Sequence, residues 1–205
     1  MKAVMISIRP EWCQKIVNGQ KTVEVRKTRP KMDTPFKGYI YCTKGQERLV
    51  AILKDGDENY GEIYHGKPVF IKTSVPSVCD MYGKRKLVIG EFICDRIYEL
   101  ETKAHGGSYY VKGEDQPTTN DVARQSCLDL KDMHAYLNSQ KGYGWHISDF
   151  KLYDKPLPLN TFKKWFRECA YSDLGLAIPE CEKCTDAGCF VQKPPQSWFF
   201  VEEMR

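Results

Sequence analysis

The run of strand-forming residues from Leu87 to Tyr98 constrains the fold of this chain more than any other feature. Its branched and aromatic side chains favour extended backbone, and Gly90 within it predicts a bulge or a close backbone approach. We expect this run to be a central strand of a sheet. Further strands are predicted from apolar or alternating patterns at residues 2–8, 22–28, 38–43, 143–152 and 197–201.

Two short helices are expected beside these strands. The first begins at Pro10, which suits the first turn of a helix, and ends before Gly19, which supplies a left-handed stop. The second has apolar residues at helical spacing from Leu130 to Leu137 and ends at Lys141-Gly142. Residues 102–120 are polar and predict a loop.

The composition is that of a globular protein. A chain of 205 residues with 41% hydrophobic and 28% charged residues can bury a substantial core, which argues against disorder. No apolar run approaches the roughly 18 residues of a membrane span, and the apolar N-terminal stretch is too short for a signal peptide. We therefore expect a cytoplasmic protein without a membrane partner. The net charge of +4 tolerates a polyanionic partner without requiring one.

A compact group of charged residues follows the first predicted helix. The helix stop at Gly19 leads into a strand whose mouth presents Lys21, Glu24 and Arg26, with Trp12 nearby on the helix. A cation, a carboxylate and a guanidinium at the mouth of one strand can hold a planar, polar ligand. An ordinary surface ion pair accounts for the same spacing.

These residues belong to a longer ordered pattern. It comprises Ser7-Ile8-x-Pro10-x-Trp12, Ile16-x-x-Gly19-x-Lys21-x-x-Glu24-x-Arg26, Gly38-x-Ile40-x-x-Thr43, Val88-x-Gly90-Glu91 and Tyr143-x-Trp145. Over about residues 1–43 and 86–152 the chain resembles the ASCH domain of the PUA-like superfamily. The segment Pro194-Pro195-Gln196-Ser197-Trp198 resembles phage and prophage members, which would place the protein in a bacterial host cytoplasm.

The resemblance implies an α+β fold, a small bent β-barrel flanked by helices, with a cleft beside the Gly-x-Lys segment. It also implies binding of RNA or a modified nucleotide in that cleft. We expect Lys21 and Arg26 to contact phosphate or carbonyl oxygens, Glu24 to accept a hydrogen bond from a base amino group, and Trp12 and Trp145 to stack on bases. The expected ligand-binding set is Ser7, Arg9, Trp12, Lys21, Glu24, Arg26, Tyr41 and Trp145. Alternatively, both tryptophans belong to the core and the basic residues are simply solvated.

Two other functions fit the same sequence. The family includes amidohydrolases that remove the acetyl group of N4-acetylcytidine, and members that cleave RNA. Lys21 matches that branch, but Glu24 stands where the branch has threonine, so a hydrolase would use Glu24 as general base and Lys21 as oxyanion stabiliser. The third alternative is a phage protein-interaction module, whose protein partner the sequence does not indicate.

The nine cysteines fall into two groups. Cys169, Cys181, Cys184 and Cys189 can surround a structural Zn²⁺, with no open position for water. A reduced, metal-free loop or a single disulfide is the alternative. The other five, Cys13, Cys42, Cys79, Cys94 and Cys127, are expected to be packing residues.

We expect two regions in the chain. The first is a barrel domain over residues 1–160, with an insertion near 45–82 that contains a hairpin, or a helix and a hairpin. The second is a Cys-rich segment over residues 161–205 that packs on the barrel. Among the four histidines only His146 stands near a predicted site residue, and an ordinary core or edge histidine accounts for it.

Overall fold

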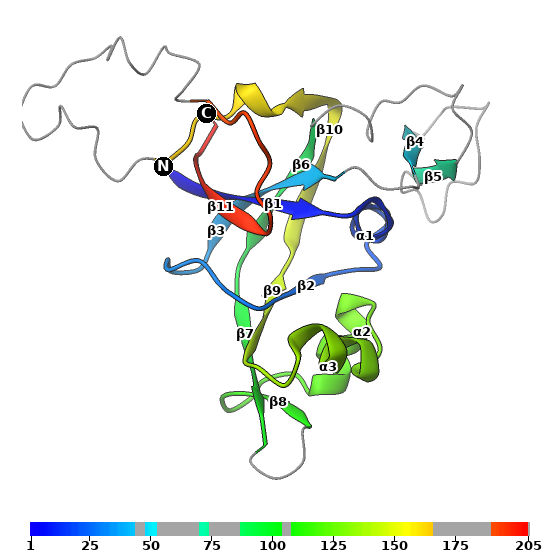
Figure 1. The fold of residues 1–205 in the computed structure, drawn as a ribbon, viewed down its shortest axis with the longest axis vertical. Coiled ribbons are helices and arrows are strands. Elements are labelled where there is room, and N and C mark those ends of the chain that lie inside the picture. Colours follow the sequence, from blue (N-terminus) through cyan, green and yellow to red (C-terminus); the bar gives the residue numbers. More distant parts are fainter. Residues whose placement is uncertain (44–47, 53–69, 74–86, 104–107, 166–189, 205) are drawn as a thin grey trace, which may run out of the picture.

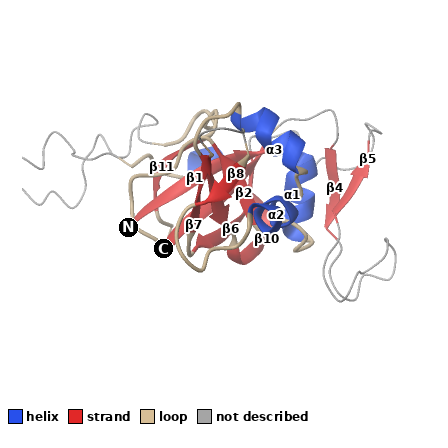
Figure 2. Cartoon of the chain, turned by 90° about the horizontal axis from the view of Figure 1, so that it is seen from below, coloured by secondary structure: helices blue, strands red, loops and turns tan. Residues whose placement is uncertain are grey.

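The computed structural model describes residues 1–43, 48–52, 70–73, 87–103, 108–165 and 190–204. The four cysteines of the predicted zinc site lie outside these residues, as does most of the predicted insertion. Within the described parts the protein is a mixed α+β fold that is rich in sheet (Figures 1 and 2).

The larger sheet has five strands. In the order in which they lie side by side, they are β10 (Ser148–Pro158), β6 (Leu87–Cys94), β3 (Phe36–Cys42), β1 (Lys2–Ile8) and β11 (Trp198–Glu202). The pair β1–β3 is parallel and the other pairs are antiparallel. Strand β6 therefore has a neighbour on each side, as expected for a central strand. A Cβ atom at Gly90 would lie 2.3 Å from the carbonyl oxygen of Lys151, which confirms the predicted close backbone approach.

The second sheet has four antiparallel strands. They are β2 (Val23–Arg26), β9 (Gly142–His146), β7 (Ile97–Thr102) and β8 (Tyr109–Val111), again in spatial order. Strand β8 lies in the segment predicted to be a loop, so that prediction was wrong for these three residues.

Two predicted strands are in fact two strands each. The run from Leu87 to Tyr98 breaks at Asp95 and Arg96, where β6 of the large sheet gives way to β7 of the small sheet. The run 143–152 breaks at Ile147 in the same way, between β9 and β10. The chain turns a corner at both places so that two sheets enclose one core. Nine of the eleven described strands form these two sheets, β4 and β5 form a separate two-stranded sheet, and a closed barrel remains a prediction.

The long strand β10 ends at Pro158, six residues beyond the predicted end at residue 152, and it includes Pro156. Strand β10 is at the edge of its sheet and pairs only with β6 among the described strands, so a residue without a backbone N–H is tolerated there.

The helices of the described residues are α1 (Pro10–Val17), α2 (Thr119–Ser126) and α3 (Leu130–Leu137), with a 3-10 turn at Leu159–Thr161. The first and third were predicted, and Gly19 after α1 has the expected positive φ of 69°. Helix α2 was missed because it is polar. Its start is marked by a capping box between Thr118 and Asp121, which is a local sequence signal for it.

Part of the predicted insertion is a hairpin. Strands β4 (Arg48–Ile52) and β5 (Phe70–Thr73) pair antiparallel, which confirms that the two apolar patches of this region form a hairpin. The hairpin lies on the side of the molecule where α1 is found, and β4 contacts α1 (Figure 1).

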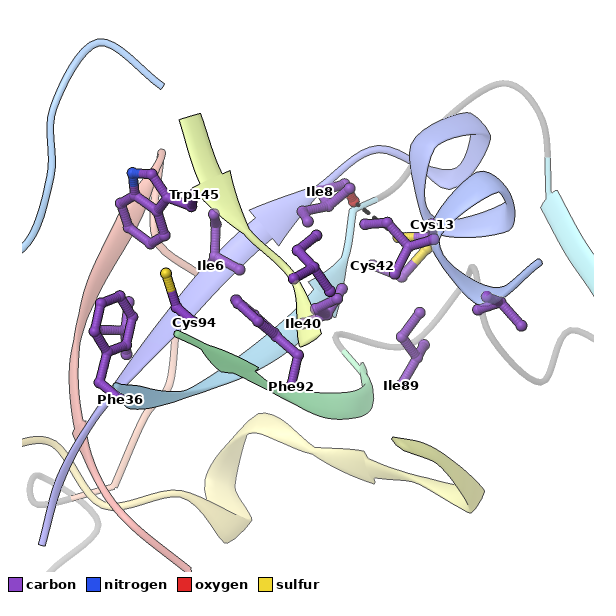
Figure 3. Packing of buried hydrophobic residues seen from close by; sticks show 14 residues of the cluster. Ile6, Ile8, Cys13, Phe36, Ile40, Cys42, Ile89, Phe92, Cys94 and Trp145 are labelled. Atoms are coloured by element: carbon purple, nitrogen blue, oxygen red, sulfur yellow. Dashed lines mark hydrogen bonds between the residues drawn. The ribbon is translucent and has the colours of Figure 1, made fainter. Parts of the chain in front are cut away.

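The main core lies between the sheets and under α1. Ile6, Ile40 and Phe92 are completely or almost completely buried there, and Trp145 joins them from β9 (Figure 3). A second cluster covers the other face of the large sheet, where Phe162 packs on Tyr39 with ring centroids 4.9 Å apart. The described parts of the C-terminal segment thus add a strand and apolar contacts to the large sheet. The domain boundary near residue 160 stays a prediction.

Candidate functional site

A pocket of about 470 Å³ opens beside the start of β2. Six of the eight predicted ligand-binding residues line it: Ser7, Arg9, Trp12, Lys21, Glu24 and Arg26. Part of the remaining wall comes from distant parts of the chain, through Leu128, Asp132, Tyr136 and Gln196. Its volume is in the usual range for small-molecule sites.

Glu24 lies at the buried end of this pocket. Side chains alternate along a strand, and Val23 and Val25 of β2 pack into an apolar cluster on the opposite face. Glu24 must therefore face the pocket, where its side chain is 10% exposed. Its Oε2 lies 3.1 Å from Nζ of Lys21, and its Oε1 lies 3.0 Å from Nε of Arg26.

The two cations decide the protonation state of Glu24. Burial alone would raise the pKa of its carboxyl group, because desolvation disfavours the charged form. The charges and hydrogen bonds of Lys21 and Arg26 more than offset burial, and the pKa is lowered below its ordinary value of 4.5. Glu24 is therefore an ionised hydrogen-bond acceptor at neutral pH.

Lys21 is fully engaged by the protein. Its Nζ donates to the carbonyl oxygens of Val23 and Ser126, both at 2.8 Å, in addition to the contact with Glu24. An ammonium group has three N–H bonds, and these three acceptors account for all of them. Lys21 is 3% exposed and joins β2, which carries Val23 and Glu24, to the end of α2 at Ser126. We call this arrangement a clamp. It leaves no N–H bond of Lys21 for a ligand.

Arg26 connects the pocket to the large sheet. Its Nη2 donates to the carbonyl oxygen of Ser7 at 2.6 Å, and its Nη1 donates to Oγ of Ser197 at 3.4 Å. Ser7 in turn donates its hydroxyl to the carbonyl oxygen of Pro195 at 2.6 Å. These bonds fix the segment before β11 against the pocket wall.

Two aromatic side chains line the pocket from different helices, Trp12 from α1 and Tyr136 from α3. Each has a lysine over its ring. Nζ of Lys15 lies 4.9 Å from the ring centroid of Trp12, and Nζ of Lys27 lies 5.5 Å from that of Tyr136. Arg9 adds an exposed guanidinium at the rim, 3.2 Å from Glu11.

Sequence reasoning missed Tyr136 as a site residue. The sequence placed it only among the residues at helical spacing, together with Met133 and Leu137, which are fully buried. Tyr136 is 42% exposed. Burial raises the pKa of its hydroxyl, and the charges of Arg26 and Glu24 also act on it, which places the ring beside both. Only the packing of α3 against β2 and α2 brings it there.

Trp145 and Tyr41 are not among the residues that line the pocket. Trp145 is directly opposite Glu24 in the β2–β9 register, so the two predicted segments do converge as neighbouring strands. Its ring is 0% exposed and packs edge-on against Phe36 with centroids 5.9 Å apart (Figure 3). Tyr41 is 3% exposed, on the far face of the large sheet. Neither ring has a free face for a base, because both complete the core.

The cysteines of the described residues match their predicted packing role in part. Cys13, Cys42 and Cys94 are buried, and Cys13 and Cys42 lie next to each other between α1 and β3 (Figure 3). Burial, with the neighbouring Cys42, raises the pKa of Cys13 well above its ordinary value, which opposes a nucleophilic role. Cys127 is half-buried, and its thiol contacts the carbonyl oxygen of Gln20 at 3.3 Å.

The predicted metal ligands Cys169, Cys181, Cys184 and Cys189 lie outside the described residues. Across the described ranges, no three His, Cys, Asp or Glu side chains come together in a way that would hold a metal ion. His146 binds Asp95 through Nδ1 at 2.5 Å, at the corner where the strands pass between sheets. Burial opposes ionisation of Asp95, but the hydrogen bond and charge of His146 lower its pKa.

A larger hollow of about 600 Å³ lies between β8, α2 and α3. Its lining includes Tyr109, Asn120, Lys131 and His134, and no charged side chain of the lining is buried. None of the predicted site residues reaches it. The pocket at Glu24 is therefore the better candidate site.

Residues 6–77 match the family model of the ASCH domain. This ASCH segment holds the Lys21–Glu24–Arg26 group and Trp12, whereas Tyr136 lies beyond it. The match confirms the sequence resemblance over its N-terminal part. None of the helices in the described parts is long and apolar enough to cross a membrane.

The chain is also similar to solved structures. A crystal structure of an ASCH protein from Zymomonas mobilis is 17% identical with a TM-score of 0.48, over 98% of this chain and 88% of that one. A tyrosine-to-phenylalanine variant from the same organism is 16% identical, over 99% and 92% of the two chains, with a TM-score of 0.48. A serine-to-alanine variant is 17% identical, over 98% and 89%, with the same score. No curated protein is significantly similar to this chain.

Proposed function

We propose that the pocket at Glu24 binds RNA, or a modified nucleotide, by holding one base. The observation that carries this proposal is a buried, ionised carboxylate in a pocket whose walls include Trp12 and Tyr136. Aromatic walls stack on a base of any sequence, and an acceptor between them binds an amino group at the base edge. The match to the ASCH domain, a family linked to RNA binding, supports the same function.

The basic residues beside the pocket favour a nucleotide within a strand over a free base. Arg9, Lys15 and Lys27 lie next to the pocket or its aromatic walls, where their charges can meet phosphate groups. This assigns phosphate contacts to Arg9 and Lys27, which are exposed, and to Lys15, which is half-buried. Lys21, which the sequence suggested for that role, supports Glu24 instead because its three N–H bonds are engaged.

Hydrolysis by Lys21 and Glu24 receives less support from the same geometry. A carboxylate with a lowered pKa is a weak general base. An oxyanion stabiliser needs a free donor, and Lys21 has none left to offer. Binding without turnover is therefore the function that the pocket supports best.

Fluorescence anisotropy with a labelled single-stranded RNA tests this function. Because a stacked base contributes about 1–3 kcal/mol, Tyr136→Ala should weaken binding by roughly 5-fold to 150-fold. Tyr110→Ala is the matched control, since Tyr110 is similarly exposed, at 37%, but lies on β8 outside the pocket lining. If both variants bind RNA as tightly as the wild type, the pocket is not the binding site.

A further inference from the structure

We propose that Glu24 makes the pocket selective for guanine, by accepting two hydrogen bonds from the N1–H and the 2-amino group of that base. This inference rests on the proposed function, because it names which base the pocket holds. It follows from counting the donors and acceptors that the protein leaves free around Glu24.

The donors of Lys21 at the buried end of the pocket are already used. The ammonium group of Lys21 spends its three N–H bonds on Val23, Ser126 and Glu24. Arg26 forms an ion pair with Glu24 through Nε, and its Nη2 and Nη1 donate to the carbonyl oxygen of Ser7 and to Oγ of Ser197. Lys21 and Arg26 affect a ligand mainly through Glu24, because their charges keep its carboxylate ionised.

The acceptors of Glu24 are only half used. An ionised carboxylate has about four lone-pair positions on two oxygens. Each oxygen of Glu24 receives one cation, at 3.1 Å from Lys21 and 3.0 Å from Arg26, which leaves one position on each oxygen for a ligand. The end of the pocket therefore presents two adjacent acceptors and accepts a pair of parallel donors.

Guanine is the standard base that offers such a pair. Its N1–H and 2-amino N–H point the same way from neighbouring atoms, as the two N–H bonds of an arginine fork do. Adenine and cytosine offer one amino group beside a ring nitrogen that carries no proton. That nitrogen is an acceptor and would face the second carboxylate oxygen, which is also an acceptor. Uracil presents one N–H between two carbonyl oxygens, so a charged carboxylate repels its edge.

The other walls are compatible with a purine. Trp12 and Tyr136 supply aromatic surface, and the apolar residues Ile8 and Leu128 also line the pocket. Asp132, the charged lining residue on α3, is exposed and is another acceptor. The lining thus combines apolar contact for the ring with acceptors for its donor edge.

Anisotropy with five labelled RNA pentamers, UUXUU, tests the selectivity. X is guanine, hypoxanthine, adenine, cytosine or uracil. Hypoxanthine differs from guanine only in lacking the 2-amino group. A good bidentate contact discriminates by about 5-fold to 150-fold, so the guanine RNA should bind more tightly than the uracil RNA by that factor. The hypoxanthine RNA, which keeps N1–H alone, should fall between them.

This comparison uses the wild-type protein, so it does not depend on any variant folding. Glu24→Gln should then reduce the preference for guanine over hypoxanthine toward one. Glu91→Gln is the control, because Glu91 is also a partly buried carboxylate with a lysine partner, at 3.6 Å from Lys37, and lies outside the pocket. A folded Glu24→Gln protein that retains the full preference would overturn the assignment to Glu24.

The remaining outcomes separate the two proposals. Equal binding of all five pentamers, or tightest binding of the adenine or cytosine RNA, overturns the guanine selectivity and leaves RNA binding intact. Absence of binding for every pentamer removes the proposed function itself, and the selectivity with it.

Discussion

Glu24 and Trp145 lie directly opposite each other across β2 and β9, yet one side chain lines the pocket and the other lies in the core. Opposite residues in an antiparallel pair point to the same face of the sheet. The buried end of the pocket therefore lies next to the part of the main core that contains Trp145. This position explains why Glu24 is nearly inaccessible to solvent and why it needs both Lys21 and Arg26 to stay ionised.

The clamp formed by Lys21 should be essential for stability. Lys21→Met removes one partner of a buried ion pair and two hydrogen bonds between β2 and α2. Breaking such a pair typically costs about 3–5 kcal/mol in the free energy of unfolding. Urea unfolding measures the loss, with Lys151→Met on the exposed side of β10 as the matched control. Equal stability of the two variants would contradict the clamp.

Glu24 should also give the protein an acid-sensitive stability. The pKa of Glu24 in the folded protein is lowered from its ordinary value of 4.5. The ionised carboxylate therefore contributes its full stabilisation of the folded state above about pH 4.5. That contribution is lost as the pH falls through the pKa of the folded protein. Unfolding of wild type and Glu24→Gln between pH 7 and 3 should show the free-energy difference shrinking only below about pH 4.5. Side-chain carboxyl NMR that finds Glu24 titrating above 4.5 would contradict this sign.

The two tryptophans of the predicted site should behave in opposite ways. Trp145→Ala removes a fully buried ring from the core and should lower the free energy of unfolding by about 3–5 kcal/mol. Trp12→Ala removes a half-buried pocket wall, so its smaller cost in stability should come with weaker RNA binding. Chemical unfolding and RNA titration of both proteins measure this. A stable Trp145→Ala protein with reduced RNA binding would reverse our assignment of the two residues.

The C-terminal cysteines should hold one zinc ion. Four thiolates at Cys169, Cys181, Cys184 and Cys189 suit tetrahedral Zn²⁺, so elemental analysis of protein purified without added metal should find about one equivalent. Cys181→Ala should lower the zinc content, whereas Cys127→Ala, a half-buried cysteine outside that set, should leave it unchanged. Metal-free wild-type protein would reject the site.

Much of the local structure could be predicted from the sequence. Strand and helix signals are local, because they come from residues that are neighbours in the chain. Branched residues mark β1, β3 and β6, and Pro10 and Gly19 mark the two ends of α1. The structure places these elements where they were expected. The failures have a common physical cause. The residues around Asp95 and Ile147 favour extended backbone, and nothing local shows that the chain must bend there to close a core.

The sequence by itself determined that Lys21, Glu24 and Arg26 would lie together, because Lys21 comes just before the short strand that carries Glu24 and Arg26. Only the tertiary structure decided what each of them does. The carbonyl oxygen of Ser126, 105 residues away, takes the bond that makes Lys21 a clamp. Helix α3 brings Tyr136 to the pocket, and packing against the large sheet buries Trp145. Such contacts join distant segments, so they depend on how the sheets and helices pack and leave no local pattern in the chain.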